Sequence, residues 1–98
     1  MENFNDIIKS EKLTLVDFFA TWCGPCKMMH PVLEQLKAEL GDAIRIIKID
    51  VDNNEEISAE YSIQSVPTLM LFKNGNVVWR QSGAKSANEL KSLIAQHS

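Results

Sequence analysis

Apolar positions along the chain alternate between the spacing of a strand and that of a helix. Short apolar runs rich in strand-forming residues predict four strands, over residues 13–19, 43–49, 68–73 and 76–82. Apolar residues three and four positions apart predict four helices: near residues 4–8, over residues 24–40, after Asn53, and after Ser86. The pattern therefore predicts the order helix, strand, helix, strand, helix, strand, strand, helix.

Local signals mark the ends of several of these elements. Gly41 is expected to end the second helix, and Asn53 is expected to cap the third, whose first turn carries acidic residues that suit the helix dipole. Asn74-Gly75 is a strong signal for a two-residue hairpin. Ser86 and Glu89 form the pattern of a capping box ahead of the last helix. The last two strands are therefore expected to be antiparallel neighbours.

The connections between the strands predict the fold class. The first two strands are joined through a helix, so we expect them to be parallel with a right-handed crossover. Because the terminal hairpin adds an antiparallel pair, the sheet is expected to be mixed, with helices on both faces. No linker, repeat or low-complexity run interrupts the 98 residues. The sequence thus predicts a single α/β domain over residues 1–98.

Composition excludes several classes of function. With 45% hydrophobic residues the chain can build a core, although a domain of 98 residues is expected to be only modestly stable. The net charge of −3 provides no basic surface for nucleic acid. No apolar stretch approaches the ~20 residues of a membrane span, and the acidic N-terminus lacks the apolar core of a signal peptide. We therefore expect a cytoplasmic protein, in which a purely structural disulfide is rare.

The strongest chemical signal is the run Trp22-Cys23-Gly24-Pro25-Cys26, which holds the chain's two cysteines. They lie two residues apart, at the junction between a predicted strand and a predicted helix. This arrangement inside a strand–helix–strand pattern is typical of dithiol–disulfide chemistry. An alternative is a pair of inert buried thiols.

A zinc site is the other alternative for the two cysteines. Tetrahedral zinc needs four ligands, and His30 and His97 are the available histidines. His97 lies at the far end of the chain, and His30 is expected on a helix surface. A c-type haem would need a histidine directly after Cys26, where Lys27 stands. We therefore expect no metal and no cofactor besides the redox-active pair Cys23–Cys26.

Over residues 4–97 the chain resembles the thioredoxin family, through the Trp-Cys-Gly-Pro-Cys motif and the order of its elements. The resemblance implies a protein-disulfide reductase that acts on disulfide-bearing proteins, is restored by a thioredoxin reductase, and works as a monomer. That family usually has a further strand before the first helix, for which this chain has no room. The sheet is therefore expected to have four strands, with residues 43–49 at an edge.

The two cysteines are expected to have different roles. Cys23 lies at the start of a helix, where backbone N–H groups and the helix dipole lower the pKa of a thiol, so it is expected to attack the substrate disulfide. Cys26 lies one turn further in and is expected to be more buried. It is expected to close on Cys23 and release the substrate.

Two charged residues interrupt predicted strands. Asp17 alternates with Leu13 and Leu15, which predicts that its carboxylate is buried. A buried carboxylate could accept the proton of Cys26. The alternative is an aspartate at an exposed strand edge. Lys48 stands among isoleucines and is the matching charged residue of the neighbouring predicted strand. Alternatively, it is a lysine at a sheet end that extends its amine into solvent. The resemblance implies that Asp17 and Lys48 face each other behind the active site.

The resemblance also implies a substrate-binding surface. The family holds a cis proline beside the disulfide, which here is Pro67, and the backbone of Val66 is expected to pair with an extended substrate. Trp22, Gly83 and Ala84 are expected to complete the apolar contact surface. From its residue type alone, Trp22 could equally belong to the core.

Gly24 and Pro25, between the two sulfurs, are assigned to the same substrate-binding surface. A rigid Gly-Pro pair resembles the reducing branch of the family and argues against an isomerase or an oxidase. A binding subunit whose dithiol face docks on a partner remains the non-enzyme alternative.

Overall fold

The computed structural model describes residues 3–98; Met1 and Glu2, at the acidic N-terminus considered above, lie outside the described residues. In chain order the elements are α1 (Phe4–Ile8), β1 (Thr14–Phe19), α2 (Gly24–Leu40), a 3-10 turn (Gly41–Ala43), β2 (Arg45–Asp50), α3 (Glu55–Glu60), β3 (Thr68–Lys73), β4 (Asn76–Ser82) and α4 (Ala87–His97). The order of helices and strands predicted from the sequence is confirmed.

The four strands form one mixed sheet in the order β2-β1-β3-β4. β1 is parallel to β2 and antiparallel to β3, and β3 is antiparallel to β4. Within residues 3–98 no strand precedes α1, and β2 lies at one edge of the sheet, as expected. The two central strands are therefore β1, which leads to the cysteine motif, and β3, which follows Pro67.

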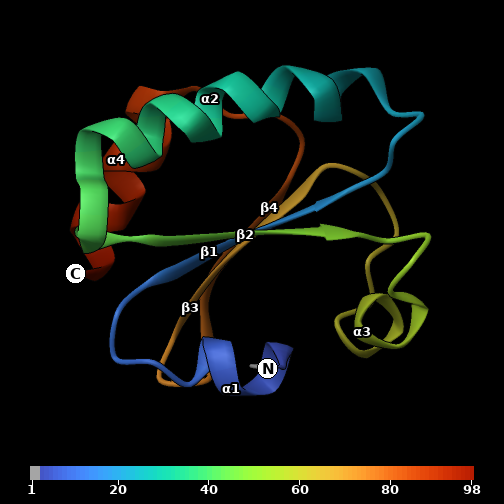
Figure 1. Cartoon of the computed structure of the whole chain (residues 1–98), viewed down its shortest axis with the longest axis horizontal. Helices are drawn as coiled ribbons and strands as arrows, with labels where there is room; N and C mark the ends of the chain where they lie inside the picture. The colour runs from blue at the N-terminus through green and yellow to red at the C-terminus, as the bar shows by residue number, and fades with distance from the viewer. Residues whose placement is uncertain (1–2) are drawn as a thin grey trace.

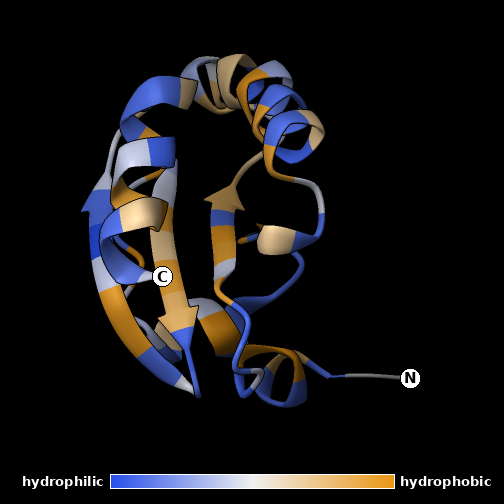
Figure 2. Ribbon diagram, turned by 90° about the vertical axis from the view of Figure 1, so that its left-hand side faces the viewer, coloured by the Kyte–Doolittle hydropathy of each residue, from blue (hydrophilic) through white to orange (hydrophobic). Residues whose placement is uncertain are grey.

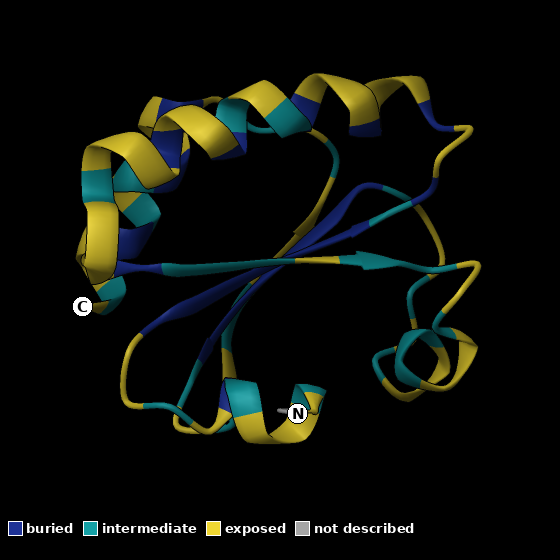
Figure 3. Ribbon diagram, viewed as in Figure 1, coloured by how far each residue is buried: buried dark blue, intermediate teal, exposed yellow. Residues whose placement is uncertain are grey.

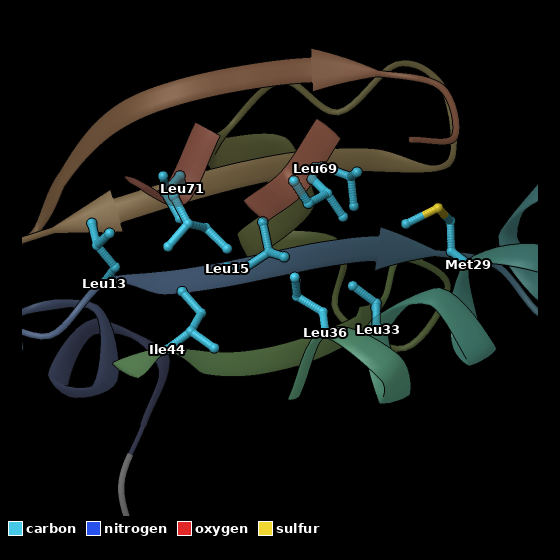
Figure 4. Packing of buried hydrophobic residues seen from close by; sticks show 10 residues of the cluster. Leu13, Leu15, Met29, Leu33, Leu36, Ile44, Leu69 and Leu71 are labelled. Carbon is cyan, nitrogen blue, oxygen red and sulfur yellow. The ribbon is translucent and has the colours of Figure 1, made fainter. Parts of the chain in front are cut away.

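Helices cover both faces of the sheet (Figure 1). α2 and α4 lie on one face, where their apolar sides pack on side chains of the strands. Figure 4 labels eight side chains of this core, which come from α2 as well as from the strands and the residues next to them. The fully enclosed part of this core consists of Leu13, Leu15, Met29, Leu33, Leu36, Ile44, Leu69, Leu71, Leu90 and Ile94. In Figure 3 the exposed residues of α2 lie on its outer side and its buried residues face the sheet, as amphipathic spacing requires.

The opposite face of the sheet packs against α1 and α3. Its core contains Val16, Phe18, Met70 and Phe72, and the ring of Phe4 from α1 meets that of Phe72 edge-to-face, with centroids 5.7 Å apart. Both sides of the central strands are therefore covered, and β1 and β3 are apolar along most of their length (Figure 2). Two buried faces explain why these strands read as continuous apolar runs in the sequence.

The hairpin and the last helix form as their local signals predicted. Asn74 and Gly75 both have positive φ (54° and 84°), the conformation that a two-residue turn between β3 and β4 requires. Ser86 Oγ accepts a hydrogen bond from the Glu89 backbone N–H at 3.2 Å, and Glu89 Oε1 accepts one from the Ser86 N–H at 3.1 Å. The capping box is therefore confirmed.

Four predicted boundaries are wrong by one or two residues, among them the end of β2, which is Asp50 rather than Ile49. β1 begins at Thr14 rather than Leu13, and β2 begins at Arg45 because residues 41–43 form a 3-10 turn. The N-cap of α3 is Asn54 and not Asn53. Asn53 belongs instead to a turn in which its side chain donates to Asp50 Oδ2 at 3.2 Å. The first backbone bond of the helix runs from the Ser58 N–H to Asn54 O, so α3 starts one residue later than predicted.

Among the helices of residues 3–98, none is both long enough and apolar enough to cross a membrane.

Candidate active site

The cysteine motif lies at the turn between β1 and α2. The Cys23 N–H donates to Ala20 O at 3.2 Å, and Cys23 is the N-cap of α2, with an extended backbone (φ −89°, ψ 117°). Pro25 occupies the first helical turn, where a missing N–H costs nothing and the fixed φ suits a helix. The sequence therefore starts the helix directly at the first sulfur.

Cys23 and Cys26 are joined as a disulfide, with their Cα atoms 5.3 Å apart. Cys23 Sγ accepts the backbone N–H of Cys26 at 3.2 Å, so the sulfur lies at the positive end of the α2 dipole. Both residues are buried, Cys26 completely and Cys23 to 5% exposure. A thiolate on Cys23 would keep the helix N–H bond, and of the two sulfur-bearing residues Cys23 is the more accessible.

The loop between α3 and β3 approaches the disulfide from a second side. Val66 O lies 3.7 Å from Cys23 Sγ, and the Val66–Pro67 peptide bond is cis, as the resemblance implied. Pro67 is buried, and its carbonyl accepts the Gly83 N–H at 2.8 Å. The structure thus brings together Cys23, Val66, Pro67 and Gly83, and exposed Ala84 follows Gly83 directly.

Trp22 extends into solvent beside the disulfide. It is 71% exposed, which contradicts the alternative that it belongs to the core. Its Nε1 donates to Asp52 Oδ2 at 3.1 Å. This bond holds the indole against the loop that follows β2. Because it joins residues 30 positions apart, local sequence gives no sign of it.

Next to Trp22 lies a groove of about 150 Å³. Its lining residues are Trp22, Val51, Ile63, Gln64, Ser65 and Val66. Of these, only Trp22 and Val66 were identified from the sequence. The others carry no chemical signal of their own, and their common position follows from the packing of the loop between α3 and β3 against the end of β2. Gly24 and Pro25 are exposed on the disulfide loop itself.

Asp17 is fully buried in β1, so the alternative of an exposed edge aspartate is wrong. It lies on the α2 side of the strand with Leu13 and Leu15, as the alternation predicted. Neither carboxylate oxygen has a hydrogen-bond partner among residues 3–98. Burial disfavours the charged form and raises the pKa of Asp17 to about 6, although the Lys48 charge opposes this increase.

Lys48 lies directly across from Asp17 in the parallel register of β1 and β2. Residues paired in this way project from the same face of a sheet, and Lys48 itself is exposed at the edge strand. The cation is close enough to lower the pKa of the Asp17 carboxyl but does not neutralise the effect of burial. The juxtaposition implied by the resemblance is therefore present.

The histidines considered for a zinc site do not join the cysteines. The His97 ring lies at the end of α4, with Nδ1 2.8 Å from Leu93 O. His30 stacks edge-to-face on Phe19, with ring centroids 5.5 Å apart. No group of three or more histidine, cysteine, aspartate and glutamate side chains within the described part of the chain could hold a metal ion.

Residues 1–96 match the family model described as Thioredoxin. The chain belongs to the thioredoxin family. It is 51% identical over 96 residues to the thioredoxin of Chlamydia trachomatis serovar D, covering 98% of this chain and 92% of that protein. It is 49% identical over 88 residues to the thioredoxin of Bacillus subtilis, covering 90% and 85%.

Solved structures agree with this assignment. A Plasmodium falciparum thioredoxin superposes with a TM-score of 0.85 at 39% identity, covering 97% of this chain and 91% of the other. Mitochondrial thioredoxin 3 of Saccharomyces cerevisiae superposes with a TM-score of 0.84 at 38% identity, covering 95% and 86%. Family membership and the Cys23–Cys26 pair together make this protein a thiol–disulfide oxidoreductase that reduces disulfides.

Proposed function

We propose that this protein reduces disulfides of proteins, with Cys23 as the attacking thiol and Cys26 as the resolving thiol. The observation that carries this division is the position of the two sulfurs: Cys23 caps α2 and is the more accessible, whereas Cys26 is completely buried. Because only a thiolate attacks a disulfide, the cysteine held at the helix N-terminus is the better nucleophile. The buried partner then needs no access to bulk substrate.

The reaction proceeds in two exchanges. The Cys23 thiolate attacks one substrate sulfur, a Cys23–substrate bond forms, and the other substrate sulfur leaves as a thiolate that takes up a proton. Cys26 then loses its proton and attacks Cys23 Sγ. The Cys23–Cys26 bond forms, the second substrate thiolate leaves, and two electrons have moved from the dithiol to the substrate. The product is the disulfide state that the structure describes.

We propose that Asp17 accepts the proton that Cys26 loses when it attacks Cys23. A carboxylate with a pKa of about 6 is ionised at neutral pH yet basic enough to hold a proton transiently, which is the property expected of a general base. Asp17 lies on the α2 side of the strand that leads into the cysteine turn. Lys48 assists by keeping the carboxylate charged despite its burial, because its positive charge lowers the pKa of Asp17.

Substrate is proposed to dock beside Cys23 on three segments. Trp22, Gly24 and Pro25 form one side, Val66 and Pro67 the second, and Gly83 with Ala84 the third. An extended substrate strand could pair with the Val66 backbone, which lies next to the attacking sulfur. A mostly apolar groove with few polar groups suits many unrelated protein substrates.

The remaining elements of the proposal concern the cellular setting. We propose that residues 1–98 act as one monomeric domain whose redox-active disulfide needs no further cofactor or metal. Oxidised protein would be restored by a thioredoxin reductase. The proposed location is the cytoplasm, where reducing conditions favour the dithiol; among the similar proteins, however, one is chloroplastic and one mitochondrial. Cell fractionation tests the location, and sedimentation tests the oligomeric state.

Turnover of insulin disulfides with NADPH and a bacterial thioredoxin reductase tests the activity. We expect NADPH oxidation that depends on both cysteines and persists after treatment with a chelator. Rearrangement of scrambled disulfides without net reduction would indicate an isomerase instead. Binding to a partner protein with no turnover would indicate a subunit of a larger assembly, and either result would refute the proposed reductase.

A further inference from the structure

Arg80 of β4 contacts the start of the loop that forms the groove. Its Nη1 donates to Tyr61 O, and its Nη2 donates to Ser62 O at 3.0 Å. Tyr61 is the C-cap of α3. Arg80 pairs in register with Met70, which packs on the α3 side of the sheet, so the guanidinium extends over the same face as α3.

One of these bonds satisfies a carbonyl that α3 cannot satisfy by itself, that of its C-cap Tyr61; Ser62 O lies one residue beyond the helix. The last carbonyls of any helix lack partners within it, and a cation near them is favourable because of the helix dipole. α3 has only six residues and no basic residue in its last turn. Arg80 supplies the missing cation from a strand 18 and 19 positions further along the chain.

The loop that follows leads directly to the substrate-binding surface. Ser62 has a positive φ of 53°, which turns the chain from α3 toward β3 (Figure 1). Residues 63–66 then line the groove beside Trp22. At the far end of the loop the Gly83 N–H donates to Pro67 O at 2.8 Å. Residues at and just after the end of β4 therefore contact both ends of this loop: Arg80 contacts its first residues, and Gly83 contacts Pro67 at its last.

We propose that Arg80 is a positioning residue for protein substrates: its two hydrogen bonds set the position of residues 63–66, and through them the Val66 backbone beside Cys23. This rests on the proposed docking of substrate on Val66. A small disulfide reaches Cys23 without the loop, whereas an extended protein strand must pair with it. The role of Arg80 is therefore specific to protein disulfides.

The test compares two disulfides with pre-reduced protein, so that no reductase is involved. Second-order rate constants are measured for insulin and for 2-hydroxyethyl disulfide, a small neutral disulfide that is insensitive to a change of protein charge. Arg80→Met keeps the apolar stem and removes the fork of donors, whereas Arg80→Lys keeps the charge. Lys12→Met removes an exposed cation just before β1, at the end of that strand away from the cysteine motif, and is the control.

We expect Arg80→Met to lower the insulin rate about fivefold and to change the small-disulfide rate less than about twofold. Arg80→Lys should be intermediate, because lysine retains the charge but cannot donate from two nitrogens in a fixed geometry. Lys12→Met should leave the ratio of the two rates unchanged. Amide hydrogen exchange should become faster in residues 62–66 of Arg80→Met and remain unchanged in β1.

Equal loss of both rates in Arg80→Met would mean that Arg80 only stabilises the fold, and an unchanged ratio would also overturn the inference. If Arg80→Met fails to fold, an Arg80→Lys ratio equal to that of the parent would overturn it. A parent protein that does not reduce insulin would refute the proposed function itself. A parent that reduces insulin with the same ratio as Arg80→Met would refute only the role of Arg80.

Discussion

Replacing Asp17 with asparagine should raise the free energy of unfolding above that of the parent, and the increase should be larger at alkaline pH than at acidic pH. The Asp17 carboxylate is completely buried, and no group in the described chain donates a hydrogen bond to it. Burial therefore raises its pKa from 3.8 to about 6 in the folded state. An asparagine has nearly the same shape but no charge, so it removes the cost of a buried anion.

The sign follows from which state binds the proton more tightly. Below pH 3.8 the group is protonated in both states and its charge costs nothing. As pH rises from 3.8 to about 6, the unfolded chain ionises and the folded state does not, so stability falls. Above this range both states are ionised, and the free energy of unfolding stays lower by a constant amount.

The two pKa values define the size of the effect. They differ by about 2.2, the difference between about 6 and 3.8, which amounts to about 3 kcal/mol at about 1.4 kcal/mol per pH unit. At pH 4 the same two values give a cost of only about 0.6 kcal/mol. The advantage of Asp17→Asn should therefore be about 2.4 kcal/mol larger at pH 8 than at pH 4.

Denaturant melts of the oxidised protein at the two pH values measure this difference, because the thiols do not titrate in the disulfide form. Any fixed cost of burying the asparagine amide is the same at both pH values and cancels. Asp42→Asn, at an exposed position, controls for the loss of one negative charge. It should change the free energy of unfolding, relative to the parent, by the same amount at pH 4 and at pH 8. If Asp17→Asn instead loses stability at pH 8 relative to pH 4, Asp17 is a paired anion and the assignment as proton acceptor is wrong.

Three further outcomes test the roles of the two thiols, the effect of Lys48 on Asp17, and the cap of α4. Cys26→Ser should trap mixed disulfides with target proteins, detected by mass spectrometry after pull-down, and equal trapping by Cys23→Ser would contradict the assigned roles. Lys48→Met should raise the pKa of Asp17 above about 6, because the lysine charge lowers it. The pH profile of the resolving step, measured by stopped flow, should then shift to higher pH. An unchanged profile would exclude Lys48 from proton transfer. Ser86→Ala should reduce the free energy of unfolding in urea by about 1 kcal/mol, because it removes the cap of α4, and no loss of stability would contradict that reasoning.

Local sequence was sufficient to predict the elements and the chemistry of the thiols. The order of helices and strands depends on periodicity over a few residues, and the hairpin at Asn74-Gly75 and the cap at Ser86 depend on conformations that these residues favour by themselves. The cysteine spacing and the helix that starts at Cys23 also lie within one short segment. These features involve neighbours in the chain, so the sequence alone determined them.

The interruption of an apolar strand by Asp17 predicted that the carboxylate is buried, and the alternation with Leu13 and Leu15 predicted which face it occupies. The sequence could not show that no donor reaches the carboxylate. The register that places Lys48 across from Asp17 entered through family resemblance, because pairing between β1 and β2 is decided by the packing of whole strands.

Only the tertiary structure decided the shape of the substrate-binding surface. The indole of Trp22 donates to Asp52, and the residues on either side of 63–66, Ser62 and Pro67, accept hydrogen bonds from Arg80 and Gly83. None of these partners is a chain neighbour of the group it holds, and an arginine or aspartate on an exposed strand or loop carries no distinctive signal. Hydrogen bonds of this kind form only after the sheet and its two helical layers have brought distant segments together, and for that physical reason the sequence could not reveal them.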